Sequence, residues 1–271
     1  MDYHGWLKSL PIVTRSTREG LCGPNVTVNG VIPCKGWKPR DYAAQPVGSL
    51  GFCSVSPEPR IPRSEYKERI LDRIKSGASL GQIARKKKVG PYNQSNTNYC
   101  WTNAVLKGCE ILRVAAGQKH VPLSPASVAA IIKNFNNVGG WGTQAAEFIK
   151  TRGAVPQSLW PANAIDRRYN TAAANAERAK YRLDEVFDMQ PNDFGLQASH
   201  LFRNRLCPFG LPWWGHEVLG VEMVLLEGTD RYGTLILNSW DISWGNEGWA
   251  ILDEEHATAA DVLAMGTMVG S

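Results

Sequence analysis

The sequence predicts an α+β protein in which an extended N-terminal arm precedes a helical lobe and an antiparallel sheet lobe. Residues 1–63 are dense in Gly and Pro and show no helical period, helical periods begin after them, and strand-type runs fill the last part of the chain. Because helices and strands are segregated along the chain, we expect two lobes that meet across a cleft. The predicted domain spans 64–271, with the helical lobe at about 64–190 and the sheet lobe at about 191–271.

Each element has its own signal. Gly and Pro in the arm favour short strands and turns over helices. Apolar residues at three- and four-residue spacing predict helices at 64–77, 79–90, 100–117, from Ser124 onward, and at 143–153, 171–187 and 192–206. Apolar runs bounded by Gly or charged residues predict strands within 218–227, 232–240 and 248–254.

The arm at 1–63 lacks the apolar surface that would offset its ordering entropy alone. Either the globular body of the same chain or a neighbouring protein must therefore hold it. The sequence leaves both alternatives open.

The composition is that of an ordinary soluble globular chain. Of 271 residues, 43% are hydrophobic and 20% are charged, and no apolar run approaches the ~18 residues of a membrane span. The first residues, MDYHGWLKSLPIVTR, lack the apolar core and cleavage site of a secretory signal, which predicts a cytoplasmic location. A net charge of +5 is too weak to indicate nucleic acid, and the basic run at 85–88 is typical of a solvated helix end.

Cysteine usage indicates neither a metal site nor a cofactor. The six cysteines are Cys22, Cys34, Cys53, Cys100, Cys109 and Cys207, and none has C-x-x-C or zinc-ligand spacing. A disulfide among the first three is conceivable, but without a secretory signal free buried thiols are more typical.

Cys100 is the candidate nucleophile because it follows a polar, turn-forming stretch and opens a predicted helix. The positive end of a helix dipole favours the thiolate. The alternative is that Cys100 is a small buried hydrophobic residue, as most lone cysteines are.

His216 is the candidate base. His4 and His256 lie near the chain ends, His120 lies in a loop and His200 lies within a helix, so each has a simpler explanation. His216 follows two tryptophans at the start of an apolar strand, where partial desolvation tunes an imidazole for proton transfer. The alternative is a structural histidine at a sheet edge.

Asn238 is the candidate orienting residue. It closes an apolar strand, where an asparagine is a poor choice unless its amide has a partner. An amide oxygen that accepts from an imidazole N–H would fix the tautomer and the ring plane. The alternative is an ordinary strand-ending turn residue.

Together these segments resemble the papain-like cysteine peptidases. The resemblance rests on Gln94-x5-Cys100-Trp101, Gly139-Gly140-Trp141, Gly215-His216 before an apolar strand, and Asn238-Ser239-Trp240…Trp244-Gly245-Asn246-Glu247-Gly248-Trp249. The segments occur in the family's order, Cys, His, Asn, and span roughly residues 90–252.

The resemblance implies a two-lobed fold in which the helix that carries the cysteine packs on a sheet, and a role for each matching residue. Cys100 would be the nucleophile, His216 the general base and acid, Asn238 the residue that orients His216, and Gln94 an oxyanion donor. Trp240 would cover the His–Asn hydrogen bond, and Trp101 follows the nucleophile. Gly139 and Gly140 would pair with an extended peptide substrate, and Trp141 would line a substrate pocket.

The sequence also departs from the family pattern. Thr97 stands where the family has a bridging cysteine, and Gly215 stands where Asp or Asn is common. Glu217 follows the histidine where a small residue is usual, which raises the question of substrate access. The arm does not resemble the helical inhibitory pro-segment of the cathepsins, so the sequence does not predict a latent zymogen.

Trp213-Trp214-Gly215-His216 and the arm resemble the papain-like proteins encoded by tailed bacteriophages and some bacteria. This implies a virion component whose arm, residues 1–63, contacts protein neighbours. Two functions follow: a thiol hydrolase that cleaves peptide or amide bonds, and a structural subunit of a large assembly with little or no peptidase activity.

Overall fold

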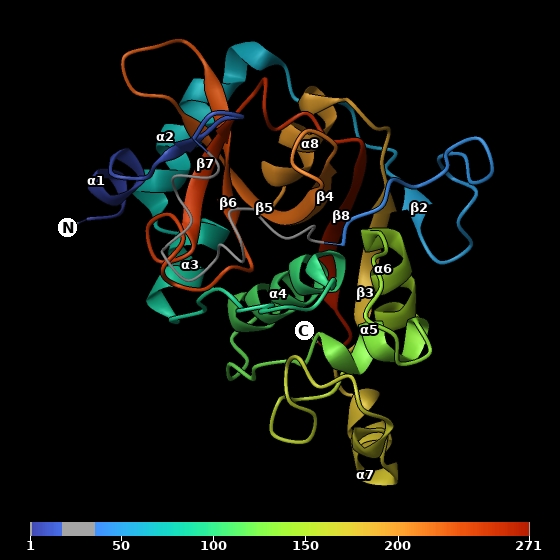
Figure 1. The fold of residues 1–271 in the computed structure, drawn as a ribbon. Coiled ribbons are helices and arrows are strands. Elements are labelled where there is room, and N and C mark those ends of the chain that lie inside the picture. The colour runs from blue at the N-terminus through green and yellow to red at the C-terminus, as the bar shows by residue number, and fades with distance from the viewer. Residues whose placement is uncertain (1, 18–35, 271) are drawn as a thin grey trace.

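An eight-stranded sheet runs through the residues that the computed structural model describes, which are 2–17 and 36–270 (Figure 1). Its strands are β1 (Ile12–Val13), β2 (Ser54–Val55), β3 (Leu183–Asp188), β4 (Cys207–Leu211), β5 (His216–Leu225), β6 (Tyr232–Leu237), β7 (Trp249–Asp253) and β8 (Asp261–Met268). Their order is β1-β7-β6-β5-β4-β8-β3-β2, and all pairs are antiparallel except the outermost pair at each edge. The predicted α+β class with an antiparallel-rich sheet is confirmed.

Helices cover the sheet. They are α1 (Tyr3–Lys8), α2 (Tyr66–Ser76), α3 (Leu80–Lys86), α4 (Cys100–Ala115), α5 (Ala126–Ile132), α6 (Gly142–Thr151), α7 (Ala172–Arg178) and α8 (Phe194–Leu201), with 3-10 turns at Arg63–Glu65 and Arg167–Tyr169. The long helix α4 packs on β4, β5 and β8 and contacts α5 and α6 (Figure 1). Within the described ranges, none of the helices has the length and apolar character that a bilayer crossing requires.

Both faces of the central strands are buried, which explains their continuous apolar runs. Side chains alternate along a strand, so Leu235 and Leu237 of β6 join the core around α4, whereas Ile236 joins a second core with α2 and α8. The sheet is therefore an internal layer between two sets of helices, and the start of β5 lies between both cores.

The prediction of an extended arm over 1–63 needs correction. Tyr3–Lys8 is helical because Asp2 caps it, with its Oδ1 accepting from the Gly5 N–H at 2.7 Å. Strand β1 then pairs with β7, and β2 pairs with β3. The described part of the arm is thus held by the body of its own chain. Cys53 is a free thiol, while Cys22 and Cys34 lie outside the described residues.

The boundary between the two lobes also needs correction. The alanine-rich stretch predicted as one helix over 171–187 is helical only at α7, and its second part is strand β3. Strand β3 pairs with β8 at the far end of the chain, so a long-range partner determines its conformation. The sheet therefore takes strands from the arm and from 64–190 as well as from 191–271.

Candidate active site

Cys100 is the first residue of α4 and is completely buried. The helix is 16 residues long, and its N-terminal half lines a narrow gap together with the start of β5 and the end of β6. This gap is lined by Tyr92, Asn103, Ala104, Lys107, Glu217, Val218, Leu237, Asn238 and Ser239. The N-terminus of α4 therefore faces the part of the sheet that carries His216 and Asn238. Trp101 is also fully buried, and its Nε1 donates to the Asn98 carbonyl oxygen at 3.0 Å.

His216 and Asn238 form a buried hydrogen bond. The His216 Nε2 lies 2.7 Å from the Asn238 Oδ1, and the same oxygen accepts from the Ser239 backbone N–H at 2.7 Å. Because an amide oxygen only accepts, Nε2 must carry the proton in this bond. In the neutral imidazole, Nδ1 is then the basic nitrogen.

Tryptophans surround the imidazole. The Trp240 ring lies 4.6 Å from the His216 ring between centroids, and the Trp214 ring lies 5.2 Å away in an edge-on arrangement. Trp244 packs against both indoles. Trp213 stacks on Trp214 and contacts the His256 ring. His216 is fully buried, so this aromatic cluster excludes water from its bond to Asn238.

Backbone and side-chain bonds join the loop before Cys100 to the end of β6. The Gln94 N–H donates to the Ser239 carbonyl oxygen at 2.9 Å, and Asn93 and Trp240 form an antiparallel bridge. The Ser239 hydroxyl donates to the Gln94 Oε1 at 2.6 Å. These bonds hold the two loops in one register, although 145 residues separate Gln94 from Ser239.

The Gln94 amide has a fixed orientation. Its Oε1 is taken by Ser239, and its Nε2 donates to the Thr97 carbonyl oxygen at 2.9 Å. An amide nitrogen carries two hydrogens, so one remains available for a further acceptor. The side chain is 2% exposed. Such a fixed, buried donor is the kind of group that an oxyanion requires.

Asparagines occupy the region where the sequence lacks the family's cysteine bridge, and none of the sequence motifs indicated their role. The Asn98 N–H donates to the Asn137 Oδ1 at 2.7 Å, and the Asn98 side chain donates to the Asn137 carbonyl oxygen at 3.0 Å. The Asn137 side chain returns a bond to the Asn96 carbonyl oxygen at 3.0 Å. This ladder joins the Cys100 loop to the loop of Gly139 and Gly140. The signal was the density of asparagine in both loops.

The chain itself occupies the backbone edge that was predicted for a substrate. Gly140 donates its N–H to the Gly36 carbonyl oxygen at 2.9 Å and accepts from the Lys38 N–H at 2.9 Å, so Trp37 pairs with Gly140 in parallel. A Cβ at Gly139 would overlap the Gly36 carbonyl oxygen. A short strand therefore does form at the glycine pair, but residues 36–38 supply it. Trp141, the N-cap of α6, is half-buried beside the Lys133 ammonium.

Residues 36–48, which we call the strap, are attached to the sheet through Trp37, through Arg40 and through the Gly48 N–H, which donates to the Asp188 Oδ2 at 2.9 Å. Trp37 is 8% exposed, and its indole nitrogen lies where a Cβ of Gly210 would be. Arg40 binds Asp188 of β3 through both of its terminal nitrogens, at 2.5 and 3.0 Å, and neither side chain is exposed. In Figure 1 the strap is the blue segment that leads to β2. Of the two alternatives that the sequence left open for the arm, the strap is thus held by the body of its own chain.

Both departures beside His216 have a structural explanation. Gly215 has φ +63° at the turn into β5, a conformation that glycine adopts freely and that Asn and Asp also tolerate. Glu217 lies beneath α6, where its carboxyl group would overlap a Cβ at Gly142. Burial, and secondarily the charge of Asp261, raises the pKa of Glu217 well above its usual range.

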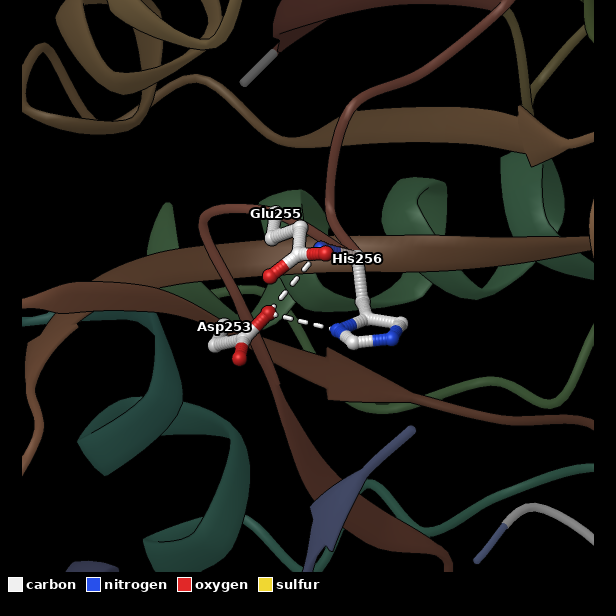
Figure 2. Close-up of side chains that lie close together, drawn as sticks. All are labelled: Asp253, Glu255 and His256. Atoms are coloured by element: carbon white, nitrogen blue, oxygen red, sulfur yellow. Dashed lines mark hydrogen bonds and ion pairs between the residues drawn. The ribbon is translucent and has the colours of Figure 1, made fainter. Parts of the chain in front are cut away.

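A cluster of possible metal ligands lies elsewhere. Asp253, Glu255 and His256 each offer one atom within 4.8 Å of the others (Figure 2). The Asp253 Oδ1 already accepts from the His256 Nδ1 at 2.8 Å and from the His256 backbone N–H at 2.9 Å. Arg231 binds the second oxygen at 3.0 Å. These bonds explain the cluster as the cap of a turn, and Glu255 is exposed.

Comparisons of the sequence and of the structure with known proteins give distant matches to cysteine peptidases. No protein-family model matches the chain. Mouse cathepsin K is 23% identical over 227 residues, which cover 75% of this chain and 66% of cathepsin K, just under two thirds of its length. Digestive procathepsin L 3 of Tenebrio molitor superposes with a TM-score of 0.56 at 15% identity, covering 66% of each chain.

Bacterial and plant structures agree as well. Xylellain, a cysteine protease from Xylella fastidiosa, gives a TM-score of 0.54 at 16% identity over 66% of this chain and 82% of its own. Bromelain protease from Ananas comosus, in complex with the E64 inhibitor, gives 0.55 at 18% identity over 66% and 93%. The chain therefore has the α+β fold of the papain-like cysteine peptidases and a distant sequence similarity to them.

Proposed function

We propose that the chain is a cysteine peptidase that cleaves peptide or amide bonds through Cys100, His216 and Asn238, with Gln94 as oxyanion donor. The observation that carries the proposal is the buried 2.7 Å bond from the His216 Nε2 to the Asn238 Oδ1. A purely structural protein gains little from a desolvated imidazole–amide pair at the mouth of a sheet, whereas a base that must keep one tautomer requires it.

The proposed chemistry follows from these positions. Transfer of the thiol proton to His216 Nδ1 frees the Cys100 sulfur to attack the substrate carbonyl carbon. The negative charge on the carbonyl oxygen is met by the second Gln94 N–H and the backbone N–H of Cys100. His216 then gives the proton to the leaving amine, and water hydrolyses the thioester by the same route, which restores the thiol.

The form described here is closed. Cys100 and His216 are both fully buried, and the strap occupies the edge of Gly140. We therefore propose that activity requires residues 36–38 to leave that edge. Trp37→Ala removes the side chain that fastens this segment. Lys38→Ala is the matched control because the Lys38 side chain is exposed and only its backbone N–H takes part in the pairing.

The test is labelling of Cys100 by a thiol-reactive peptidyl epoxide near pH 6.5. We expect labelling in the wild type, faster labelling in Trp37→Ala, an unchanged rate in Lys38→Ala, and loss in Cys100→Ser and His216→Ala. Labelling that spreads evenly over all cysteines, or that survives His216→Ala, would contradict the proposal.

The second candidate function is a structural subunit of a large assembly, which the complete burial of Cys100 and His216 favours. Virion association, implied by the resemblance to phage proteins, is a prediction of this candidate. A structural subunit without peptidase activity requires that Cys100 stay unlabelled in Trp37→Ala even though the variant folds. The same labelling series therefore distinguishes the two functions.

A further inference from the structure

The strap's Trp37 fills a slot whose floor is Gly210 of β4. Gly210 pairs with Glu217 on β5 and with Asp261 on β8. Residues directly opposite each other in antiparallel strands place their side chains on the same face, about 4.5–5.5 Å apart. The carboxyl groups therefore flank the space that a Gly210 side chain would take, and the Trp37 indole fills that space.

The two carboxyl groups converge. Glu217 is 2% exposed and Asp261 is 3% exposed, and the two groups are close enough for the charge of Asp261 to raise the pKa of Glu217. Among the described residues, the Glu217 Oε2 and the Asp261 Oδ2 have no hydrogen-bond partner. Buried oxygens of this kind are rare in folded proteins because an unpaired polar group costs free energy.

The slot holds two carboxyl groups without a dedicated cation. The positive charge of Arg40 acts on Asp261, but Arg40 is committed to Asp188 through two short bonds. Tyr42 contributes a hydroxyl 3.5 Å from the Asp261 Oδ1 but no positive charge. Burial raises the pKa of Asp261 to about 7, and the charge of Arg40 offsets this effect only in part.

Trp37 fills the slot but makes no hydrogen bond to its two carboxyl groups. Its indole N–H is buried and makes no hydrogen bond to any described residue, although it lies on the face that both carboxyl groups share. A flat apolar ring thus covers two acceptors that a different side chain would bind. An extended peptide that replaced residues 36–38 along Gly140 would bring one of its side chains over the same slot.

We propose that Glu217 and Asp261 form a pocket that selects a cationic side chain, arginine above all, at the substrate residue paired with Gly140. The guanidinium offers five donors in a planar fork, enough to reach both unpartnered oxygens, and its positive charge favours the ionised form of both carboxyl groups. This substrate class rests on the proposed peptidase function, whereas the affinity of the slot for a cation is a separate property of the fold.

The first test uses the strap as a tethered ligand and needs no activity. We compare the thermal unfolding of Trp37→Arg and Trp37→Met at pH 7.5. Arginine and methionine both have an unbranched aliphatic stem, and only arginine is charged. We expect Trp37→Arg to melt at least about 3 °C higher, because charge-assisted hydrogen bonds replace unpaired oxygens. When Glu217→Gln and Asp261→Asn are also introduced, the difference in melting temperature between the two Trp37 variants should disappear. An equal or lower midpoint for Trp37→Arg in the original background overturns the pocket, as does a difference that survives loss of both carboxylates.

The second test measures selection directly. Two peptidyl epoxides that are identical except for arginine or its neutral isostere citrulline are reacted with Trp37→Ala and with the wild type. We expect the arginine probe to label Cys100 at least about 10-fold faster, and the ratio to approach one when Glu217→Gln and Asp261→Asn are added. Equal labelling by both probes refutes the selectivity and leaves the peptidase proposal intact. No labelling by either probe refutes the peptidase proposal, and the melting comparison still decides whether the slot binds a cation.

Discussion

Replacing Arg40 by Met removes half of the buried ion pair that fastens the strap to β3. Arg40 and Asp188 have no exposed side-chain surface, and Arg40 also donates to the carbonyl oxygens of Gln45 and Pro46 at 2.7–3.1 Å. After the replacement, Asp188 keeps a bond from the Gly48 N–H at 2.9 Å and loses its cation. The variant therefore leaves a buried carboxylate without a counter-charge.

The expected magnitude follows from that geometry. Removing one partner of a buried ion pair costs about 3–5 kcal/mol, because the remaining charge is desolvated and uncompensated. In a chain of this length each kcal/mol lowers the melting temperature by roughly 2–4 °C, so we expect a fall on the order of 10 °C. The double variant Arg40→Met/Asp188→Leu removes both charges and should recover most of the loss, since apolar residues of similar volume replace a buried pair at little cost.

Urea and thermal unfolding, followed by tryptophan fluorescence, measure both variants. We also expect Arg40→Met to label faster at Cys100, because the strap loses its anchor while α4 and β5 keep their contacts. A loss of stability below about 1 kcal/mol in Arg40→Met, or a double variant as unstable as the single one, would refute the reasoning that the ion pair fastens the strap.

Four further outcomes are expected. Gln94→Ala should lower the rate of peptide turnover about 10²–10³-fold, because one oxyanion donor is lost, and a steady-state assay with a matched Gln94→Glu variant checks it. Asn238→Ala should lower kcat roughly 10–100-fold with KM little changed, since its amide binds the base and not the substrate, and an equal rise in KM would argue against an orienting role. Gly36→Ala should loosen the strap and accelerate thiol labelling, because Gly36 has φ +83° and an added Cβ would overlap the Asn98 carbonyl oxygen; a labelling rate equal to wild type would contradict it. Burial raises the pKa of Asp261 to about 7, so its contribution to stability is complete below about pH 4 and is lost as the pH rises through 7. The melting temperature of Asp261→Asn should therefore fall less steeply than that of the wild type between pH 4 and pH 7. Parallel plots of melting temperature against pH would contradict the assignment.

The fold was predictable wherever local signals agreed with the final contacts. The helix that starts at Cys100 was expected to run to Gly117, and it ends at Ala115. It was predictable because the spacing of its apolar residues matches the faces that it buries. The stretch after α7 was not predictable, since Leu183–Asp188 forms a strand by pairing with β8 and β2, which are distant in the sequence. Helix α1 had a readable signal, the Asp2 cap, but Gly and Pro elsewhere in the arm obscured it.

The candidate site was predictable as a set of residues and not as a closed arrangement. Side-chain chemistry and order along the chain suffice to select His216 and Asn238. Nothing local to Trp37 indicates that it pairs with Gly140 and covers Gly210, because both partners lie more than 100 residues away. One signal was available in retrospect: a glycine inside the apolar strand CPFGL marks a place where another part of the chain approaches closely.

The two outermost strands of the sheet, β1 and β2, are both short and both come from the N-terminal segment. Strand β1 pairs with part of the outer edge of β7, and strand β2 pairs with part of the outer edge of β3. If the first 63 residues were cut away, those edges would offer open donors and acceptors to any other polypeptide, including a second copy. A shortened protein is therefore expected to self-associate through its sheet borders.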